Sequence, residues 1–254
     1  SEIGKNLFAH GGVWECPDLL QFNVNGKTSW VLLVSMNPGG PNGGSATQYI
    51  VGDFDGHAFK PYSTDIKWMD YGPDNYAGVT FSNVGDRNIL IGWMSNWNYA
   101  NVVPTEKWRS AMTVPRELKL IEQNNNNANS NDFLLVSSPV KEMKKAFTEI
   151  ISKENVIPNR IDLKEMKVVD FEIILSNTFN EKLVVGYHAD KNQFYIDRTQ
   201  AGVSNFNDGF ATVAVAPRLS FATNMDLSIL LDKTSIELFA DGGRTVMTTL
   251  FFPV

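Results

Sequence analysis

The chain has 254 residues, 43% of them hydrophobic and 20% charged, so it can bury the core of one large or two medium domains and disorder is not expected. Its net charge of -6 repels phosphates, which argues against nucleic acid as a partner. No apolar run is long enough for a membrane-spanning helix, so no membrane partner is expected.

Short apolar runs separated by turn residues dominate the first half of the chain and predict β-strands. Strands are expected at residues 30–35, 48–54, 76–81 and 88–94, with turns at 37–44, 55–56 and 85–86. This spacing is typical of an all-β protein. It does not distinguish a propeller of four-stranded units from a sandwich of two sheets.

The second half of the chain predicts a further all-β unit. Residues 124–132, rich in asparagine, indicate a long surface turn between two strands, and residues 139–151 indicate a short amphipathic turn or helix. Strands are then expected at residues 171–175, 183–187, 193–197, 211–216, 227–231, 235–239 and 245–252, with a hairpin turn at 241–243. We place a domain boundary at residue 140, which divides residues 1–140 from 141–254.

The residue types needed for several common kinds of site are missing or badly spaced. His10, His57 and His188 lie far apart along the chain, and the single Cys16 cannot build a thiolate site or an intrachain disulfide. The sequence has neither a Gly-x-Ser-x-Gly elbow nor a phosphate-binding Gly-Lys-Ser/Thr loop. No metal and no cofactor are therefore expected.

Glu15 is the carboxyl with the most informative surroundings, in the segment Trp14-Glu15-Cys16-Pro17-Asp18. Pro17 restricts the local backbone, and Gly11 and Gly12 allow a close approach of the chain. A carboxyl between an indole and a thiol is expected in a partly apolar wall, where desolvation favours the protonated form that a general acid needs. The alternative interpretation is a surface glutamate beside a core tryptophan.

The same segment resembles the acid/base motif of glycoside hydrolase family 32, the invertases, inulinases and levanases. Residues 70–77 resemble the family's Asp-x-Gly-x-Asp-x-Tyr-Ala signature. Other stretches that resemble family blocks follow in chain order, at residues 35–49, 91–97, 104–118, 196–202 and 236–243. The resemblance covers nearly the whole chain.

The resemblance implies the later blades of a five-bladed β-propeller followed by a C-terminal β-sandwich. It implies hydrolysis of β-fructofuranosyl linkages in sucrose, inulin or levan with retention, by two carboxyls about 5–5.5 Å apart. It also implies an extracellular or periplasmic location.

In this resemblance Glu15 matches the acid/base and Trp93 matches the tryptophan that lines the fructose pocket. Four further residues are expected to contact substrate: Asn37, Trp14, Tyr76 and Asp70. Asp70 and Tyr76 have a second interpretation, in which they only tie the blade together, and Trp97 and Arg109 share this ambiguity.

Two motifs of the family do not occur in this sequence. The family's nucleophile lies in an Asn-Asp-Pro motif and its transition-state-stabilising aspartate in an Arg-Asp-Pro motif, and neither tripeptide is present. The chain is therefore expected to be a fragment, nearly inactive by itself, that could also lack the last strands of the sandwich.

Two alternatives stay open. Another chain or a second copy could supply the missing blades, because an incomplete propeller exposes strand edges and apolar faces. The chain could instead be a noncatalytic module that binds fructan through its tryptophan-lined wall.

Overall fold

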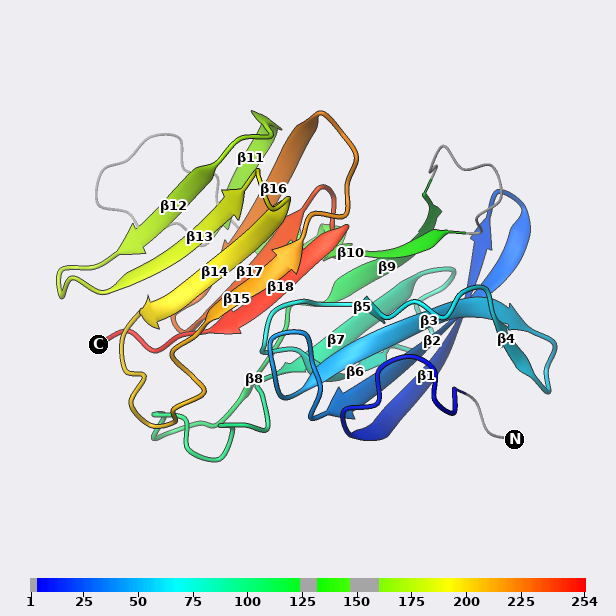
Figure 1. The fold of residues 1–254 in the computed structure, drawn as a ribbon, viewed down its shortest axis with the longest axis horizontal. Helices are drawn as coiled ribbons and strands as arrows, with labels where there is room; N and C mark the ends of the chain where they lie inside the picture. The colour runs from blue at the N-terminus through cyan, green and yellow to red at the C-terminus, as the bar shows by residue number, and fades with distance from the viewer. Residues whose placement is uncertain (1–3, 124–131, 147–159) are drawn as a thin grey trace.

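The protein is built of β-strands throughout. A computed structural model describes residues 4–123, 132–146 and 160–254 and arranges their strands in four antiparallel sheets (Figure 1). The strands of the first half are β1 (Val13–Val24), β2 (Lys27–Asn37), β3 (Ala46–Phe54), β4 (Phe59–Pro61), β5 (Lys67–Trp68), β6 (Tyr76–Thr80), β7 (Asn88–Met94), β8 (Ala111–Met112), β9 (Arg116–Glu122) and β10 (Phe133–Pro139). The 3-10 helix η1 (Lys141–Ala146) follows.

The strands of the second half begin after residue 159. They are β11 (Arg160–Lys167), β12 (Phe171–Ser176), β13 (Lys182–His188), β14 (Gln193–Gln200), β15 (Val213–Pro217), β16 (Asn224–Leu231), β17 (Ser235–Ala240) and β18 (Thr245–Leu250). No strand is shared between the sheets of the two halves.

The first two sheets share one hydrophobic core. One sheet has the order β1-β2-β3-β4 with β5 beside β3, and the other has the order β10-β9-β7-β6 with β8 beside β7. Alternate side chains such as Val31 and Leu33 point to one face of β2, as the period of a strand requires, and they pack against Leu90 and Leu118 of the other sheet. This packing brings the edge strands β1 and β6 into contact.

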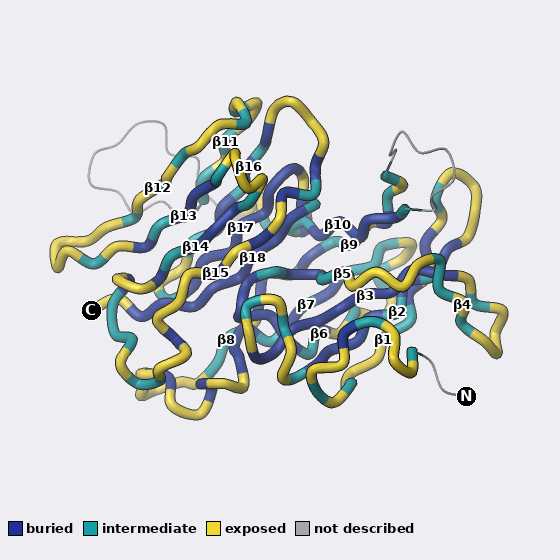
Figure 2. Tube along the Cα trace, viewed as in Figure 1, coloured by how far each residue is buried: buried dark blue, intermediate teal, exposed yellow. Residues whose placement is uncertain are grey.

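The last two sheets, β11-β16-β17-β18 and β12-β13-β14-β15, pack face to face around a second core. All residues of β17 and β18 are buried, which Figure 2 shows as dark blue strands in the middle of the molecule. Ile236, Leu238 and Met247 point into the second core, whereas the alternate residues Glu237 and Thr248 bond to the first half. These two strands are therefore covered on both faces.

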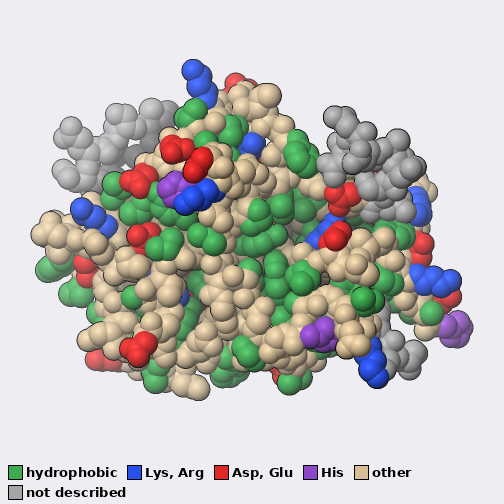
Figure 3. All heavy atoms as spheres, viewed as in Figure 1, with side chains coloured by type: hydrophobic (Ala, Val, Ile, Leu, Met, Phe, Trp, Pro, Cys, Tyr) green, Lys and Arg blue, Asp and Glu red, His purple; other side chains and the backbone are tan. Residues whose placement is uncertain are grey.

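Charged side chains lie mainly toward the margin of the face seen in Figure 3, and its central region carries few of them. Among the residues described, no helix is long and apolar enough to cross a membrane.

The all-β prediction is confirmed, and each strand expected from the sequence overlaps an observed one. The expected strand at 211–216 begins two residues later, at Val213, and the expected turn or helix at 139–151 is a 3-10 helix as far as Ala146. Residues 147–151 and all but the last residue of the expected turn at 124–132 lie outside the described residues.

Candidate active site

The backbone around Glu15 is shaped by a β-bulge at the start of β1. Glu15 pairs with Ser35 and Asp18 with Leu33, so Cys16 and Pro17 together face one residue of β2. Pro17 has no N–H for the ladder, and Cys16 has a φ of 48°. A bulge of this kind bends its strand and redirects side chains.

The two glycines before β1 let the chain pass close to the loop that follows β2. A Cβ atom on Gly12 would lie 2.1 Å from the carbonyl oxygen of Asn37, and one on Gly11 would lie 2.5 Å from the Cα of Gly39. The close approach expected from the sequence is therefore observed, and a side chain at either position would force the two segments apart.

The Glu15 carboxyl is bonded to a buried tyrosine on the neighbouring sheet. The Tyr76 hydroxyl donates to Glu15 Oε2 at 2.5 Å, and Tyr76 is 3% exposed. Burial first, and then the Glu15 carboxylate, raise the pKa of Tyr76 well above its usual value. The phenol therefore keeps its proton at neutral pH and acts as the donor.

The expected surroundings of Glu15 need a correction. The sequence suggested a partly apolar wall that desolvates the carboxyl, but both Glu15 and Cys16 are exposed. The bulge directs the carboxyl to the surface, where it can meet a ligand, and only the bond to Tyr76 links it to the interior of the protein.

Aromatic rings extend the surface on one side of Glu15. Trp93 pairs with Tyr76 across β6 and β7, with ring centroids 6.3 Å apart, and Trp93 packs against Trp97 at 4.9 Å. Trp97 is 49% exposed and Trp93 is half-buried. We call Glu15, Tyr76, Trp93 and Trp97 the carboxyl–aromatic surface.

Asn37 lies next to this surface through a residue that the sequence interpretation left without a role. Ser45 Oγ donates to Asn37 Oδ1 at 2.9 Å and accepts a hydrogen bond from the Trp97 backbone N–H at 3.0 Å. Ser45 lies in the stretch 35–49 that resembles a family block, but only the folded chain joins it to Trp97.

Trp14 and Asp70 lie apart from the carboxyl–aromatic surface. Trp14 points away from Glu15, because neighbouring residues of a strand point to opposite faces. Its ring stacks on His10, with ring centroids 4.7 Å apart, and its indole N–H donates to the carbonyl oxygen of Ala9. Asp70 is 2% exposed and accepts hydrogen bonds from Gly72, Asn75, Arg116 and, through two groups, Thr248. These bonds agree with the second interpretation of Asp70, because its carboxylate ties the two halves together.

Arg109 also binds backbone instead of the site. Its guanidinium donates to the carbonyl oxygens of Asn101 and Thr105, within its own loop.

The structure does reveal a second link between β1 and β6, in which Asp18 accepts hydrogen bonds from the N–H and hydroxyl of Thr80 at 3.2 and 2.6 Å. Asp18 ends the segment that contains Glu15, and nothing in the sequence assigned it a role.

The described residues contain no group of three or more His, Cys, Asp and Glu side chains placed to hold a metal ion. An exposed carboxyl beside neighbouring aromatic rings suits a ligand that has both hydroxyl groups and apolar C–H faces, as a sugar does. The described residues thus form an all-β protein with an exposed carboxyl beside aromatic rings.

Comparison with known families agrees with this class. Residues 1–131 match the N-terminal domain of glycosyl hydrolases family 32, and residues 116–254 match the family's C-terminal domain. The chain belongs to glycoside hydrolase family 32, as the sequence resemblance predicted.

Named relatives include fructan-degrading enzymes. A levanase of Bacillus subtilis (strain 168) is 37% identical over 281 residues, which cover 100% of this chain and 41% of the levanase. An extracellular exo-inulinase of Aspergillus niger is 37% identical over 290 residues, covering 100% of this chain and 52% of the inulinase.

Solved structures of the family superimpose on the chain. The exo-inulinase from Aspergillus awamori gives a TM-score of 0.82 at 32% identity, covering 98% of this chain and 53% of that one. A β-fructofuranosidase from Schwanniomyces occidentalis, complexed with fructosyl-erythritol, gives 0.74 at 29% identity, covering 94% and 54%. The chain thus spans about half the length of these relatives.

Proposed function

We propose that this chain contributes the acid/base carboxyl, Glu15, and part of the sugar-binding surface to a retaining hydrolase of β-fructofuranosyl linkages. The observation that carries the proposal is the exposed Glu15 carboxyl, bonded to Tyr76 at the carboxyl–aromatic surface. Its support is the family membership and the relatives named levanase and exo-inulinase.

In this proposal the two oxygens of Glu15 have different tasks. Tyr76 holds Oε2, and Oε1 faces the glycosidic oxygen of the substrate. Protonated Glu15 gives its proton to that oxygen as the bond to the anomeric carbon breaks, while a second carboxylate attacks the carbon and forms a fructosyl ester. The Glu15 carboxylate then takes a proton from water, whose oxygen attacks the anomeric carbon and releases the second carboxylate.

The second carboxylate is the nucleophile. In the family it lies in an Asn-Asp-Pro motif, which this sequence does not contain. Neither Asn-Asp-Pro nor Arg-Asp-Pro occurs in the 254 residues. We therefore expect the chain alone to hydrolyse sucrose, inulin and levan at no measurable rate, since the nucleophile and acid/base act as a unit.

The remaining blades would restore activity in this proposal. β1–β4 and β6–β10 would be two blades of a propeller, and β11–β18 would form a sandwich. The exposed side chains of Val13, Val79 and Phe81, on or next to the edge strands β1 and β6, would pack against the rest of the propeller. The extracellular names of relatives support a secreted protein.

The test uses a longer protein in which this sequence is joined to the remaining blades, which carry the Asn-Asp-Pro and Arg-Asp-Pro motifs. Fructose release should appear, and Glu15→Gln should lower kcat about 10²–10⁴-fold, the range for loss of a general acid. Glu165→Gln is the matched control, because Glu165 is an exposed glutamate on β11 in the other half of the chain. Equal activity of Glu15→Gln and wild type would refute the role of Glu15.

A second candidate function rests on the exposed rings of the same surface. Trp97 and Trp93 could hold a fructan without hydrolysing it, and the chain would then be a binding module. The 254-residue chain is expected to release no fructose under either candidate, so the longer protein distinguishes them. Retardation of the chain in levan gels, with no fructose release by the longer protein, supports binding alone, and unchanged mobility of the chain argues against it.

A further inference from the structure

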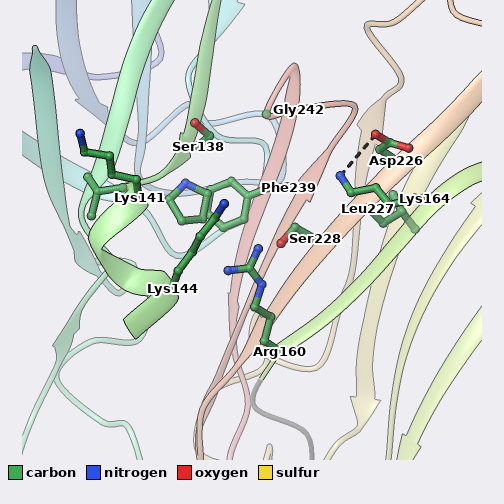
Figure 4. Close-up of a pocket in the computed structure, with 13 residues that line it drawn as sticks. Ser138, Lys141, Lys144, Arg160, Lys164, Asp226, Leu227, Ser228, Phe239 and Gly242 are labelled. Carbon is green, nitrogen blue, oxygen red and sulfur yellow. Dashed lines mark hydrogen bonds and ion pairs between the residues drawn. The ribbon is translucent and has the colours of Figure 1, made fainter. Parts of the chain in front are cut away.

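A cavity of about 170 Å³ lies where η1 meets β11 and the β17–β18 hairpin, and none of its lining residues belongs to the carboxyl–aromatic surface (Figure 4). A water molecule in the liquid occupies about 30 Å³, so the cavity has room for a small oxyanion and some water. Phe239, which is buried, and Gly242 form uncharged parts of its wall.

The charge of this cavity is opposite to the net charge of the chain. Lys141 and Lys144 of η1 and Arg160 and Lys164 of β11 line it, and Asp226 is the one acidic side chain among its described lining residues. Figure 4 shows Lys144 and Arg160 pointing toward one another and Lys164 reaching toward Asp226. Like charges that line one cavity repel each other, and an anion between them offsets this repulsion.

Ion pairs account for only part of the positive charge. Lys164 Nζ lies 3.3 Å from Asp226, and Arg160 Nε lies 2.7 Å from Asp162. Neither Lys141 nor Lys144 forms an ion pair with a described residue. Among the described residues, Lys141 and Lys144 therefore line the cavity without an ion pair, and a dianion would match their two positive charges.

We infer that this cavity binds a small phosphate-type dianion, with Lys144 and Arg160 as its principal contacts and Lys141 at its edge. The phosphate can be inorganic or part of a sugar phosphate, since both present the same charge and oxygen acceptors. The bound dianion would link η1 to β11, which come from the two halves of the chain. This inference is independent of the proposed hydrolase.

The pH dependence separates a bound dianion from a general attraction of anions. A phosphate monoester loses its second charge below its second pKa of about 6, and inorganic phosphate does so at a somewhat higher pH, whereas sulfate stays a dianion. The acidic groups at the cavity remain ionised over this range: backbone hydrogen bonding from Glu165 lowers the pKa of Asp226, and bonds from Arg160 and Ser228 outweigh burial to lower that of Asp162. Phosphate should therefore bind more weakly at pH 5 than at pH 8, while sulfate should bind equally.

Calorimetric titration of the chain with inorganic phosphate, fructose 6-phosphate, sulfate and fructose, at low ionic strength, tests the inference. We expect saturable binding of the three anions with a Kd of about 1 mM or lower and no binding of fructose. Lys144→Gln should weaken binding at least about fivefold, and Asp226→Asn should tighten it about threefold by removing a competing carboxylate. A preference for fructose 6-phosphate over inorganic phosphate would identify a sugar phosphate as the ligand, and equal affinity would identify free phosphate.

Lys145→Gln is the matched control, because Lys145 is an exposed neighbour on η1 that does not line the cavity. It should bind like the wild type. The inference is overturned if no anion saturates, if Lys144→Gln binds as tightly as wild type, if Lys145→Gln weakens binding equally, or if sulfate weakens in parallel with phosphate at pH 5.

Discussion

Glu15 and Tyr76 come from different sheets, and their hydrogen bond connects a surface carboxyl to the protein interior. A long acidic side chain on a surface usually samples many rotamers, and fixing it costs entropy. The bond to a buried phenol reduces this freedom in advance. Tyr76 is therefore a positioning residue for Glu15 in the proposed reaction.

Tyr76→Phe removes this bond and leaves the ring. In the longer, active protein we expect kcat to fall about tenfold with little change in KM, since about 1.4 kcal/mol of positioning is lost after substrate is bound. Tyr62→Phe is the control, because Tyr62 donates a comparable bond to Asp53 outside the site. Steady-state kinetics on sucrose check the prediction, and an unchanged kcat for Tyr76→Phe would contradict it.

Trp97 offers a large apolar face to solvent at the carboxyl–aromatic surface. Trp97→Ala should weaken fructan binding about fivefold or more and change the free energy of unfolding by less than about 1 kcal/mol, as for most exposed side chains. Trp108→Ala, at a similarly exposed tryptophan, is the comparison. Levan-gel mobility and urea denaturation measure the two effects; a large loss of stability with unchanged binding would make Trp97 a structural residue.

The edge strands β1 and β6 carry the site, and each contains a bulge near its start. Register shifts occur between Glu15 and Asp18 and between Tyr76 and Val79. Bulges redirect side chains and interrupt the alternation of polar and apolar residues. The sequence did not predict the bulged β1 at residues 13–24, although it did predict β6, in spite of its bulge, and the regular β7.

The strands β9, β17 and β18 meet in a buried ionic network. The Arg116 guanidinium lies 2.7 Å from Asp70 and 2.5 Å from Glu237, and Arg116 is 0% exposed. It also donates to Thr248 Oγ1 at 2.6 Å. A similar pair joins Arg198 to Asp74 at 2.8 Å, so both aspartates of the signature segment fasten the first half to the second.

Arg116→Met should cost about 3–5 kcal/mol of unfolding free energy, because two carboxylates would remain buried without their cation. Arg87→Met provides the contrast: Arg87 pairs with Glu142, whose side chain is 55% exposed, and its loss should have a much smaller effect. Urea denaturation compares the two, and equal losses would show that the Arg116 network gives no special stability.

At the scale of the whole molecule, two tyrosines with raised pKa values make stability sensitive to alkaline pH. Burial raises the pKa of Tyr71 to about 12, and burial with the Glu172 hydrogen bond does the same for Tyr195. In the unfolded chain both ionise near pH 10. The folded state therefore holds these protons more tightly, and their contribution is complete below pH 10 and is lost as the pH rises from about 10 to 12.

We expect the free energy of unfolding to be steady up to about pH 10 and to fall above it. Urea denaturation at a series of pH values, with phenolate absorbance recorded in parallel, measures this. Glu172→Gln should lower the pH at which the Tyr195 phenolate forms. Ionisation of all tyrosines near pH 10 in a protein that stays folded would contradict the prediction.

The sequence by itself determined the all-β class, most strand positions, the family and the choice of Glu15, because these depend on local alternation, turn residues and short motifs. Only the tertiary structure decided that Tyr76 holds Glu15, that Ser45 joins Asn37 to Trp97, and that Asp70 is a buried tie. It also left Glu15 exposed where local composition suggested an apolar wall. The physical reason is that burial and pairing depend on contacts between sheets far apart in the chain, and neighbouring residues in a sequence do not encode which strands will meet.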